Sequence, residues 1–122
     1  MIQKLPFRSR RCDRRPANLS LKQLSELSLV FSRAQALHQA GRLPEAEEMY
    51  RQILRMKPNH WNGLLYLGVI HHQRGDHNEA LHQIDATLKV NPTIAAAYRT
   101  RGNALEKLKR FDEAVASYDR AI

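Results

Sequence analysis

Cysteine is nearly absent from this chain of 122 residues, because Cys12 is the only one. No intramolecular disulfide can therefore form, and we expect a reducing, cytoplasmic environment. Long apolar runs are also lacking. No segment has the length of a membrane-spanning helix, and the N-terminus has no apolar stretch of the kind that a secretory signal needs. The sequence thus predicts a chain without a membrane span.

Catalytic and metal-binding motifs are lacking as well. The sequence contains no phosphate-binding glycine loop, no dinucleotide-binding glycine pattern and no Ser-His-Asp order. Its six histidines are not spaced as zinc-protease ligands, and no cysteine lies near them. We therefore predict no catalytic activity, no cofactor and no metal site, and we interpret His71 and His77 as packing residues.

The sustained alternation of apolar and polar residues that marks a β-strand is missing too. Hydrophobic residues make up 43% of the chain, which is enough for a core and argues against wholesale disorder. The apolar residues recur instead at helical spacing, as Leu24, Leu27, Phe31 and Ala34 do. The sequence therefore predicts an all-α fold.

Positive charge is concentrated at the N-terminus. The formal net charge is +8, and residues 1–17 carry +5 of it, through six basic residues against Asp13. This Arg-rich stretch superficially resembles an organelle transit peptide, but it has no periodic apolar face. We predict a basic, disordered tail over 1–17 that makes only non-specific contact with nucleic acid or an anionic membrane.

A regular period, of about 34 residues, organises the rest of the chain. The central unit, 61–94, carries a set of mostly small or apolar residues whose positions recur one period earlier and one period later. They are Leu64, Leu67, Gly68, His71, Ala80, Ile84 and Pro92 in the central unit, Val30, Arg33, Ala34, Leu37, Ala46, Tyr50 and Pro58 before it, and Tyr98, Arg101, Gly102, Leu105, Ala114 and Tyr118 after it. A fixed period of this length predicts stacked repeats rather than one closed globule.

Each unit has the pattern of two helices joined by a tight turn. In the central unit, Gly75 breaks the first helix, Asn78 is the expected cap of the second, and Pro92 ends it. Gly68 and Ala80 present little side chain, so we expect the two antiparallel helices to approach closely at these residues.

These repeated positions resemble the tetratricopeptide repeat (TPR) family, whose pattern has Leu-Gly and an aromatic residue in the first helix, then Ala, an aromatic residue and a closing Pro. The resemblance implies a right-handed α-solenoid of antiparallel helix pairs, in an array over 18–122. Its repeats run at about 27–60, 61–94 and 95–122, and the last one is truncated.

Three residues depart from the family pattern, and they put local packing in doubt. Arg33 and Arg101 stand where leucine is usual, and Lys109 stands where glycine is usual. Because the third repeat stops in mid-helix, we expect the N-terminal fragment of a longer TPR protein. Self-association that covers this uncapped C-terminal helix is the alternative.

Local signals predict several further details of the first two repeats. A capping box of Ser20 and Gln23 is expected to start a long first helix, whose first two turns cap the array. Pro44 is expected in the first turn of the next helix, where its missing N–H costs nothing. We interpret Trp61 as a packing residue between the first two repeats.

The first helix of each pair is expected to line the concave face of the solenoid. Its inward positions offer apolar patches with amides and a guanidinium, which suit the backbone and a carboxylate of an extended peptide. The residues predicted to bind a partner are Phe31, Gln35, Asn62, Leu65, Tyr66, Val69, His72, Arg99 and Asn103. The alternative interpretation is that Phe31, Leu65 and Val69 only pack against neighbouring helices.

Chaperone-binding members of the family share a two-carboxylate clamp of lysines, asparagines and an arginine. The corresponding positions here hold Phe31, Gln35, Tyr66, Ala96 and Thr100, and none of these is basic. The resemblance therefore implies a ligand other than the acidic C-terminal tail of a heat-shock chaperone.

Two classes of function follow from the sequence. The first is a scaffold that binds a peptide or a partner protein and has no activity of its own. The second is the N-terminal, substrate-recruiting TPR region of a larger enzyme, such as a glycosyltransferase that resembles O-linked N-acetylglucosamine transferase. The sequence beyond Ile122 would distinguish these two classes.

Overall fold

The computed structural model describes residues 19–122, so the predicted tail over 1–17 lies outside the described residues. Residues 19–122 form helices and no strand. The helices are α2 (Leu21–Gln39), α3 (Leu43–Met56), α4 (Trp61–Gln73), α5 (His77–Val90), α6 (Ala95–Lys107) and α7 (Phe111–Ala121). The predicted all-α fold is confirmed. None of these helices combines the length and the apolar character needed to cross a membrane.

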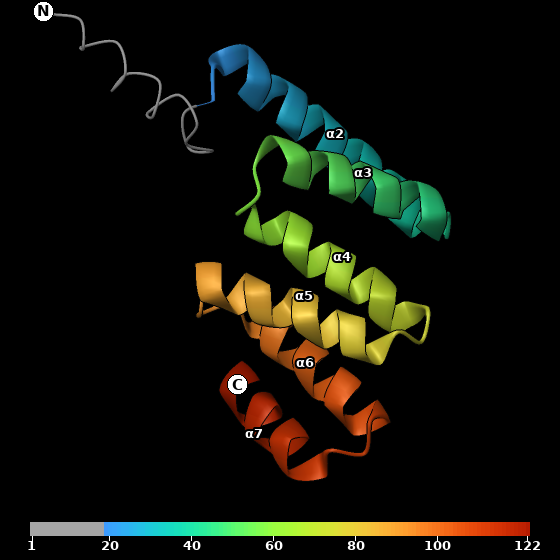
Figure 1. Cartoon of the computed structure of the whole chain (residues 1–122), viewed down its shortest axis with the longest axis vertical. Coiled ribbons are helices and arrows are strands. Elements are labelled where there is room, and N and C mark those ends of the chain that lie inside the picture. The colour runs from blue at the N-terminus through green and yellow to red at the C-terminus, as the bar shows by residue number, and fades with distance from the viewer. Residues whose placement is uncertain (1–18) are drawn as a thin grey trace, which may run out of the picture.

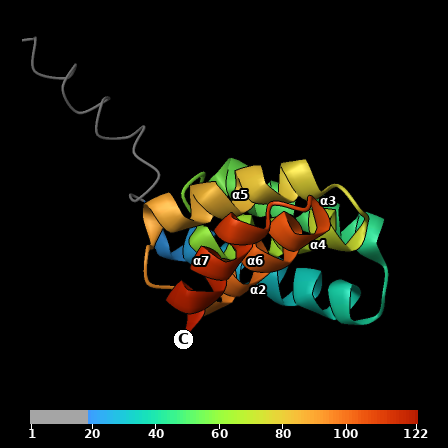
Figure 2. The same ribbon diagram turned by 90° about the horizontal axis from the view of Figure 1, so that it is seen from below.

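The helices stack as pairs along the long axis of the molecule, with α2 at one end and α7 at the other (Figure 1). In that view α3 lies in front of α2, and α5 lies in front of α6. Seen from below, α3 and α5 lie on one side of the stack and α2 lies on the opposite side (Figure 2). The helix pairs thus stack one after another, which is the solenoid that the sequence predicts.

Helix starts follow the period of the sequence. The second helices begin at Leu43, His77 and Phe111, and the later first helices begin at Trp61 and Ala95, so equivalent helices start one period apart. This spacing places chemically similar residues at the same point of each pair.

The predicted capping box at the start of α2 is present. Gln23 N–H donates to Ser20 Oγ at 3.1 Å, and Ser20 N–H donates to the Gln23 side-chain oxygen at 2.9 Å. The predicted place of Pro44, in the first turn of α3, is also confirmed. The predicted cap of α5 is wrong, because the helix begins at His77 after Asp76, which leaves Asn78 inside its first turn.

The turn inside each pair closes in the same way. The N–H groups of Arg42, Asp76 and Arg110 donate to carbonyl oxygens five residues earlier, at 2.8–2.9 Å. This bond requires a left-handed residue just before the donor. Gly41 and Gly75 take that conformation with φ values of 80° and 91°. Lys109 takes it with φ 64°, although a Cβ atom disfavours it.

Replacing Lys109 by glycine is expected to raise the free energy of unfolding by about 0.5–1 kcal/mol, because relief of the left-handed strain exceeds the entropy that glycine adds to the unfolded chain. Urea denaturation measures the difference. The matched control is Lys107→Gly, at the last residue of α6, which has no left-handed strain to relieve and should not gain stability. A loss of stability in Lys109→Gly would contradict this account of the turn.

Three clusters of buried residues join consecutive helices. The first joins α2, α3 and α4 through Leu27, Ala34, Ala46, Tyr50, Ile53, Leu67 and Ile70. Another joins α4, α5 and α6 through Leu65, Ile84 and Ala97. The last joins α5, α6 and α7 through Ala80, Leu81, Ala104, Leu105 and Ala114. Trp61 packs against the cluster of Leu65 and Ala97, so its predicted place between the first two repeats is wrong.

A glycine in the first helix lets the two helices of a pair approach closely, but Ala80 does not lie against Gly68 as predicted. A Cβ atom on Gly68 would lie 2.8 Å from Ile84 Cδ1, and one on Gly102 would lie 2.6 Å from the Tyr118 ring. The large residue of the second helix therefore packs directly on the backbone of the first. Ala80 instead belongs to the cluster that connects α5 with the third repeat.

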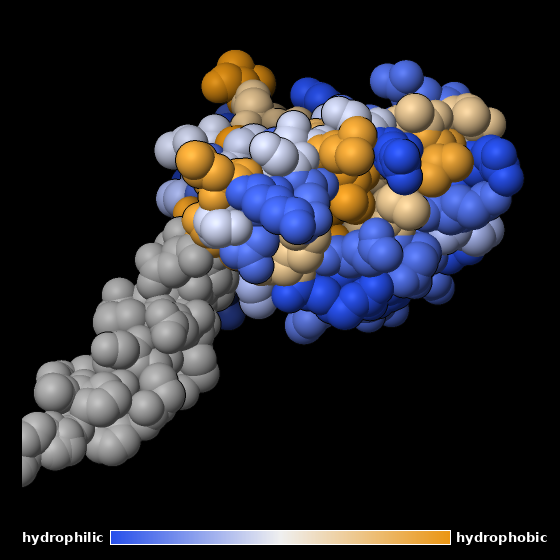
Figure 3. Space-filling view, turned by 90° about the horizontal axis from the view of Figure 1, so that it is seen from above, coloured by the Kyte–Doolittle hydropathy of each residue, from blue (hydrophilic) through white to orange (hydrophobic). Residues whose placement is uncertain are grey.

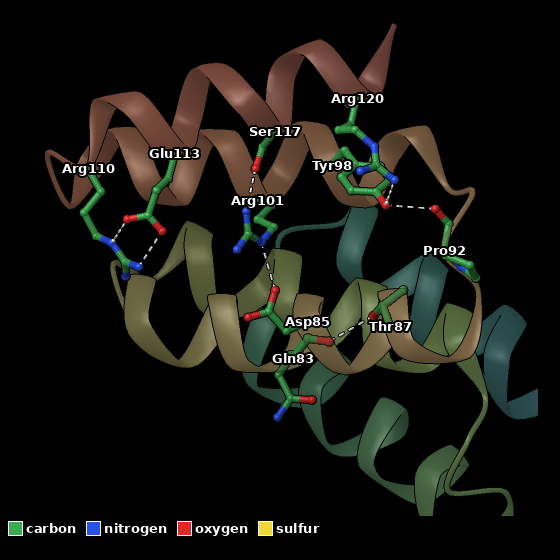
Figure 4. A network of polar contacts seen from close by, with 10 residues as sticks. All are labelled: Gln83, Asp85, Thr87, Pro92, Tyr98, Arg101, Arg110, Glu113, Ser117 and Arg120. Atoms are coloured by element: carbon green, nitrogen blue, oxygen red, sulfur yellow. Dashed lines mark hydrogen bonds and ion pairs between the residues drawn. The ribbon is translucent and has the colours of Figure 1, made fainter.

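Arg101, one of the departures from the family pattern, is accommodated by polar partners (Figure 4). Its guanidinium donates to Asp85 Oδ1 at 2.9 Å and to Ser117 Oγ at 2.7 Å. Asp85 lies on α5 and Ser117 on α7, so the side chain bridges two second helices where leucine would pack. Arg33, the other departure in this slot, is exposed to solvent and needs no buried partner.

The N-terminal end of the stack carries apolar side chains between hydrophilic ones (Figure 3). Leu21, Leu24 and Leu29 of α2 are 83%, 45% and 55% exposed. The first two turns of α2 precede the first repeat, and Leu21 and Leu24 leave their surface partly apolar, so their role as a cap stays a prediction.

Candidate functional site

Two hollows lie along the first helices of the repeats. The first hollow, about 400 Å³, is lined by Gln35, His38, Gln39, Tyr50, Tyr66, Val69 and Gln73. The second hollow, about 420 Å³, is lined by His72, Asn103, Glu106, Lys107, Lys109 and Phe111. Both volumes fall in the range of pockets that take a small ligand or a few side chains.

Aromatic rings form the wall of the first hollow. The rings of Tyr50 and Tyr66 stack with centroids 5.7 Å apart and an interplanar angle of 11°. His38 meets both rings edge to face, at 6.2 Å and 6.1 Å. Phe31 packs edge-on against Tyr66 at 5.9 Å. These contacts fix the orientation of the rings that a ligand would meet.

His60 supports this aromatic cluster from the start of α4. Its ring lies 5.7 Å from that of Phe31, and its Nδ1 accepts the N–H of Gly63 at 2.9 Å as the helix cap. Burial, and then the charge of Lys57, lower the pKa of His60. The neutral imidazole that the cap requires is therefore the favoured form.

The rim of the first hollow is polar but uncharged. Gln35 and Gln39 come from α2, and Gln73 ends α4. His38 Nε2 lies 2.8 Å from the Gln73 side-chain oxygen, so a hydrogen bond joins α2 to α4 at the hollow. Among residues 19–122, the lining includes no aspartate, glutamate, lysine or arginine. Amides that both donate and accept suit a neutral polar ligand.

Tyr50 contributes a hydroxyl group that is buried without a partner. The residue is fully buried, and its Oη has no hydrogen-bond partner within the described part of the chain. Burial, followed by the neighbouring Tyr66, raises the pKa of Tyr50 well above its usual range. The phenol therefore keeps its proton and can donate a hydrogen bond at any physiological pH.

The second hollow has charged walls. His72 Nδ1 lies 3.0 Å from His77 Nδ1, and burial, followed by the charges of His77 and Lys107, lowers the pKa of His72. Asn103 is already engaged, because its Oδ1 accepts the Tyr118 hydroxyl at 2.6 Å. The same hydroxyl also lies 2.9 Å from Glu106 Oε1. These contacts hold α7 against α6.

His71, which the sequence predicts to be a packing residue, is buried and only 6% exposed. His77 is half-buried against His72, at a ring distance of 4.9 Å. Within residues 19–122, no group of three or more His, Cys, Asp or Glu side chains is placed to hold a metal ion.

The structure distributes the predicted partner-binding residues over several environments. The first hollow includes Gln35, Tyr66 and Val69, and the second hollow includes His72 and Asn103. Phe31 contacts the rings of the first hollow, whereas Asn62 and Arg99 line neither hollow. Leu65 must be corrected: it is 5% exposed and packs with Ile84 and Ala97, so it does not reach the surface.

Four lining residues of the first hollow, His38, Gln39, Tyr50 and Gln73, are not in the list predicted to bind a partner. Gln39 and Gln73 occupy equivalent positions one period apart, one step beyond His38 and His72, so the period itself would have indicated them. Tyr50 comes from a second helix, and the assumption that only first helices line the concave face excluded it.

Helix pairs that repeat in phase and stack along one axis, with two hollows along the first helices, are typical of a repeat solenoid. The profile of the tetratricopeptide repeat family matches residues 31–83 and 73–122. The chain belongs to the tetratricopeptide repeat family.

The chain is similar in sequence to curated proteins, among them the following two. The photosystem I assembly protein Ycf3 of Rippkaea orientalis is 32% identical over 87% of this chain and 65% of its own length. The protein O-mannosyl-transferase TMTC1 of Homo sapiens is 30% identical over 82% of this chain and 12% of its own length. The chain thus spans less than two thirds of either relative.

Among solved structures, the first TPR domain of Spaghetti (RPAP3), bound to the HSP90 peptide SRMEEVD, superposes with a TM-score of 0.76. The two sequences are 18% identical, and the match covers 80% of this chain and 77% of that one. At this identity the similarity shows the fold alone.

Proposed function

We propose that this chain is an interaction scaffold that binds an extended segment of a partner protein along α2, α4 and α6. The first hollow carries the proposal, because it combines a fixed aromatic wall with an uncharged amide rim. Such a surface binds peptide main chain and side chains without chemistry of its own. A relative that is named as an assembly protein supports a scaffold role.

The ligand differs from an acidic C-terminal tail. The positions of the two-carboxylate clamp hold Phe31, Gln35, Tyr66, Ala96 and Thr100. In the structure the rings of Phe31 and Tyr66 pack against each other, so they occupy space that a clamp would fill with cationic groups. The peptide of the RPAP3 complex, SRMEEVD, is acidic, and nothing in the first hollow complements its charge.

A triple variant, Gln35→Ala with Gln39→Ala and Gln73→Ala, tests the proposal. These three amides form the rim of the first hollow and lie on first helices, so we expect peptides selected from a random library on the natural chain to bind the variant at least tenfold more weakly. Fluorescence anisotropy with labelled peptides measures the affinities.

The matched control is Gln52→Ala with His82→Ala and Lys89→Ala, three exposed polar residues of the second helices. We expect this control to bind the selected peptides with unchanged affinity. Equal losses in both triple variants, or no loss in either, would show that binding does not use the first helices.

A second candidate function is the substrate-recruiting region of a larger enzyme. The similarity to a mannosyltransferase of which the chain covers 12% favours it. Residues 1–122 would then deliver a protein substrate to a separate catalytic domain. Sequencing the transcript beyond the codon of Ile122 tests this candidate, because it requires an open reading frame that encodes such a domain.

The cytoplasmic location and the non-specific contacts of residues 1–17 stay predictions. A fluorescent fusion of the chain, with and without these residues, tests both. We expect a diffuse cytoplasmic signal from both fusions, and weaker retention of the truncated chain on a polyanion column at low salt.

A further inference from the structure

The second hollow differs from the first hollow in its charge. Two lysines, Lys107 and Lys109, line it, and Glu106 is the one carboxylate among its described lining residues. Glu106 is already engaged, because its Oε1 lies 2.9 Å from the Tyr118 hydroxyl. Neither lysine forms an ion pair within the described part of the chain. The second hollow therefore presents an excess of unpaired positive charge.

We infer, resting on the proposed function, that the second hollow takes a side-chain carboxylate, of aspartate or glutamate, from the partner segment whose neighbouring residues lie on the first hollow. Lys107 pairs with this carboxylate, and the amide of Asn103 donates a hydrogen bond to it. The groove thus recognises a neutral side chain and an acidic one within a single segment.

The positive potential of the second hollow acts on His72, which lines it. Burial, followed by the charges of His77 and Lys107, lowers the pKa of His72. His77 belongs to α5 and Lys107 to α6, so two neighbouring helices disfavour a further positive charge at this place. The same potential favours a negative group, and Lys109 adds to it, whereas Glu106 opposes it.

Asn103 supplies hydrogen-bond donors beside these charges. Its Oδ1 faces the Tyr118 hydroxyl at 2.6 Å, which leaves the NH₂ group, with two N–H donors, for the hollow. On α6, Arg99 lies one turn before Asn103 and Lys107 one turn after it. Residues four apart share one face of a helix, so three groups that suit a carboxylate lie in a row.

Helix α4 contributes to both hollows at its C-terminal end. Val69 and Gln73 line the first hollow, and His72 lines the second. Because His72 and Gln73 are adjacent in sequence, a segment that crosses this end of α4 passes from the uncharged hollow to the positive one. None of the residues that line the second hollow occupies a position of the two-carboxylate clamp. The second hollow thus takes a side chain rather than a chain terminus.

Selection of a phage-displayed random decapeptide library on the whole chain tests the inference. We expect the selected peptides to share an aspartate or glutamate at one fixed position. For one such peptide, at low salt, Lys107→Gln should weaken binding about two- to fivefold, and replacing the acidic residue by its amide should weaken binding by a similar factor. Both changes together should cost little more than either alone, because they remove the same ion pair.

Lys89→Gln is the matched control, because Lys89 is exposed in the last turn of α5 and lines neither hollow. This variant should bind the peptide with unchanged affinity. An NMR titration of His72 gives a second readout. The bound acidic peptide should raise the pKa of His72, because a nearby carboxylate stabilises the imidazolium, and the amide peptide should not.

The other outcomes separate this inference from the scaffold function. Peptides without an acidic residue at a shared position, additive effects in the cycle, an equal loss in Lys89→Gln, or an unchanged pKa of His72 would overturn the inference. Acidic residues scattered over all positions would do the same, because they indicate attraction to the basic residues 1–17. These results leave the scaffold function standing if the glutamine variant of the first hollow still loses affinity. A selection that yields no binding peptide would overturn both.

Discussion

Replacing Leu105 by alanine is expected to lower the free energy of unfolding by about 2–5 kcal/mol. Leu105 is fully buried on α6, in the cluster with Leu81 of α5 and Ala114 of α7. The remaining side chains cannot close the space, because alanines supply most of the cluster and have no atoms to extend into it. Urea denaturation followed by circular dichroism measures the loss.

The loss of stability in Leu105→Ala should also be concentrated in the third repeat. Each repeat of a solenoid contacts only its neighbours, so a cavity in this cluster weakens the attachment of the third repeat more than the rest. Hydrogen exchange in Leu105→Ala should therefore accelerate most in α6 and α7. The control is Leu21→Ala, which is 83% exposed and should change stability by less than about 0.5 kcal/mol. Uniform acceleration from α2 to α7 would contradict the division into clusters.

Replacing Gly68 by leucine is expected to destabilise the protein by about 1–3 kcal/mol. The added Cβ atom alone would lie 2.8 Å from Ile84 Cδ1 and 3.1 Å from Ile84 Cγ1, so the larger side chain forces α4 and α5 apart. Denaturation midpoints of the variant and the natural chain give the difference.

A double-mutant cycle tests whether Gly68 packs on Ile84. Gly68→Ala adds only the Cβ atom, and Ile84→Val removes the Cδ1 atom that it would meet, at a cost of about 0.5–1.5 kcal/mol alone. The combined variant should be more stable than the sum of the single effects predicts, because the valine makes room for the alanine. As a control, His82→Leu places leucine at an exposed position of α5 and should be nearly neutral. Strict additivity would show that Gly68 does not pack on Ile84.

The fold was predictable because its signals are short-range and repeated. A glycine that permits the left-handed turn, a proline in a first turn and apolar residues at helical spacing each act within a few residues. The period of the sequence then repeats these signals, so the starts of α3, α5 and α7 could be predicted in phase. Even Lys109, which departs from the pattern, adopts the backbone conformation that the turn imposes.

The candidate site was predictable only in part. The period identified which residues of the first helices face inward, and Gln35, Tyr66 and Val69 do line one hollow. It misplaced Leu65, because the angle at which α4 meets α5 and α6 decides which side of the helix is covered. That angle depends on side chains from three helices at once.

Taken by itself, the sequence determined the helices, their pairing and their stacking, since these follow from local turn chemistry and a repeated apolar pattern. Only the tertiary structure decided that Arg101 pairs with Asp85 and Ser117 and that Ile84 packs on the backbone at Gly68. It also decided that the hydroxyl of Tyr50 is buried without a partner among residues 19–122. The reason is physical: these contacts join residues of different helices, and their distances are set by how the helices cross.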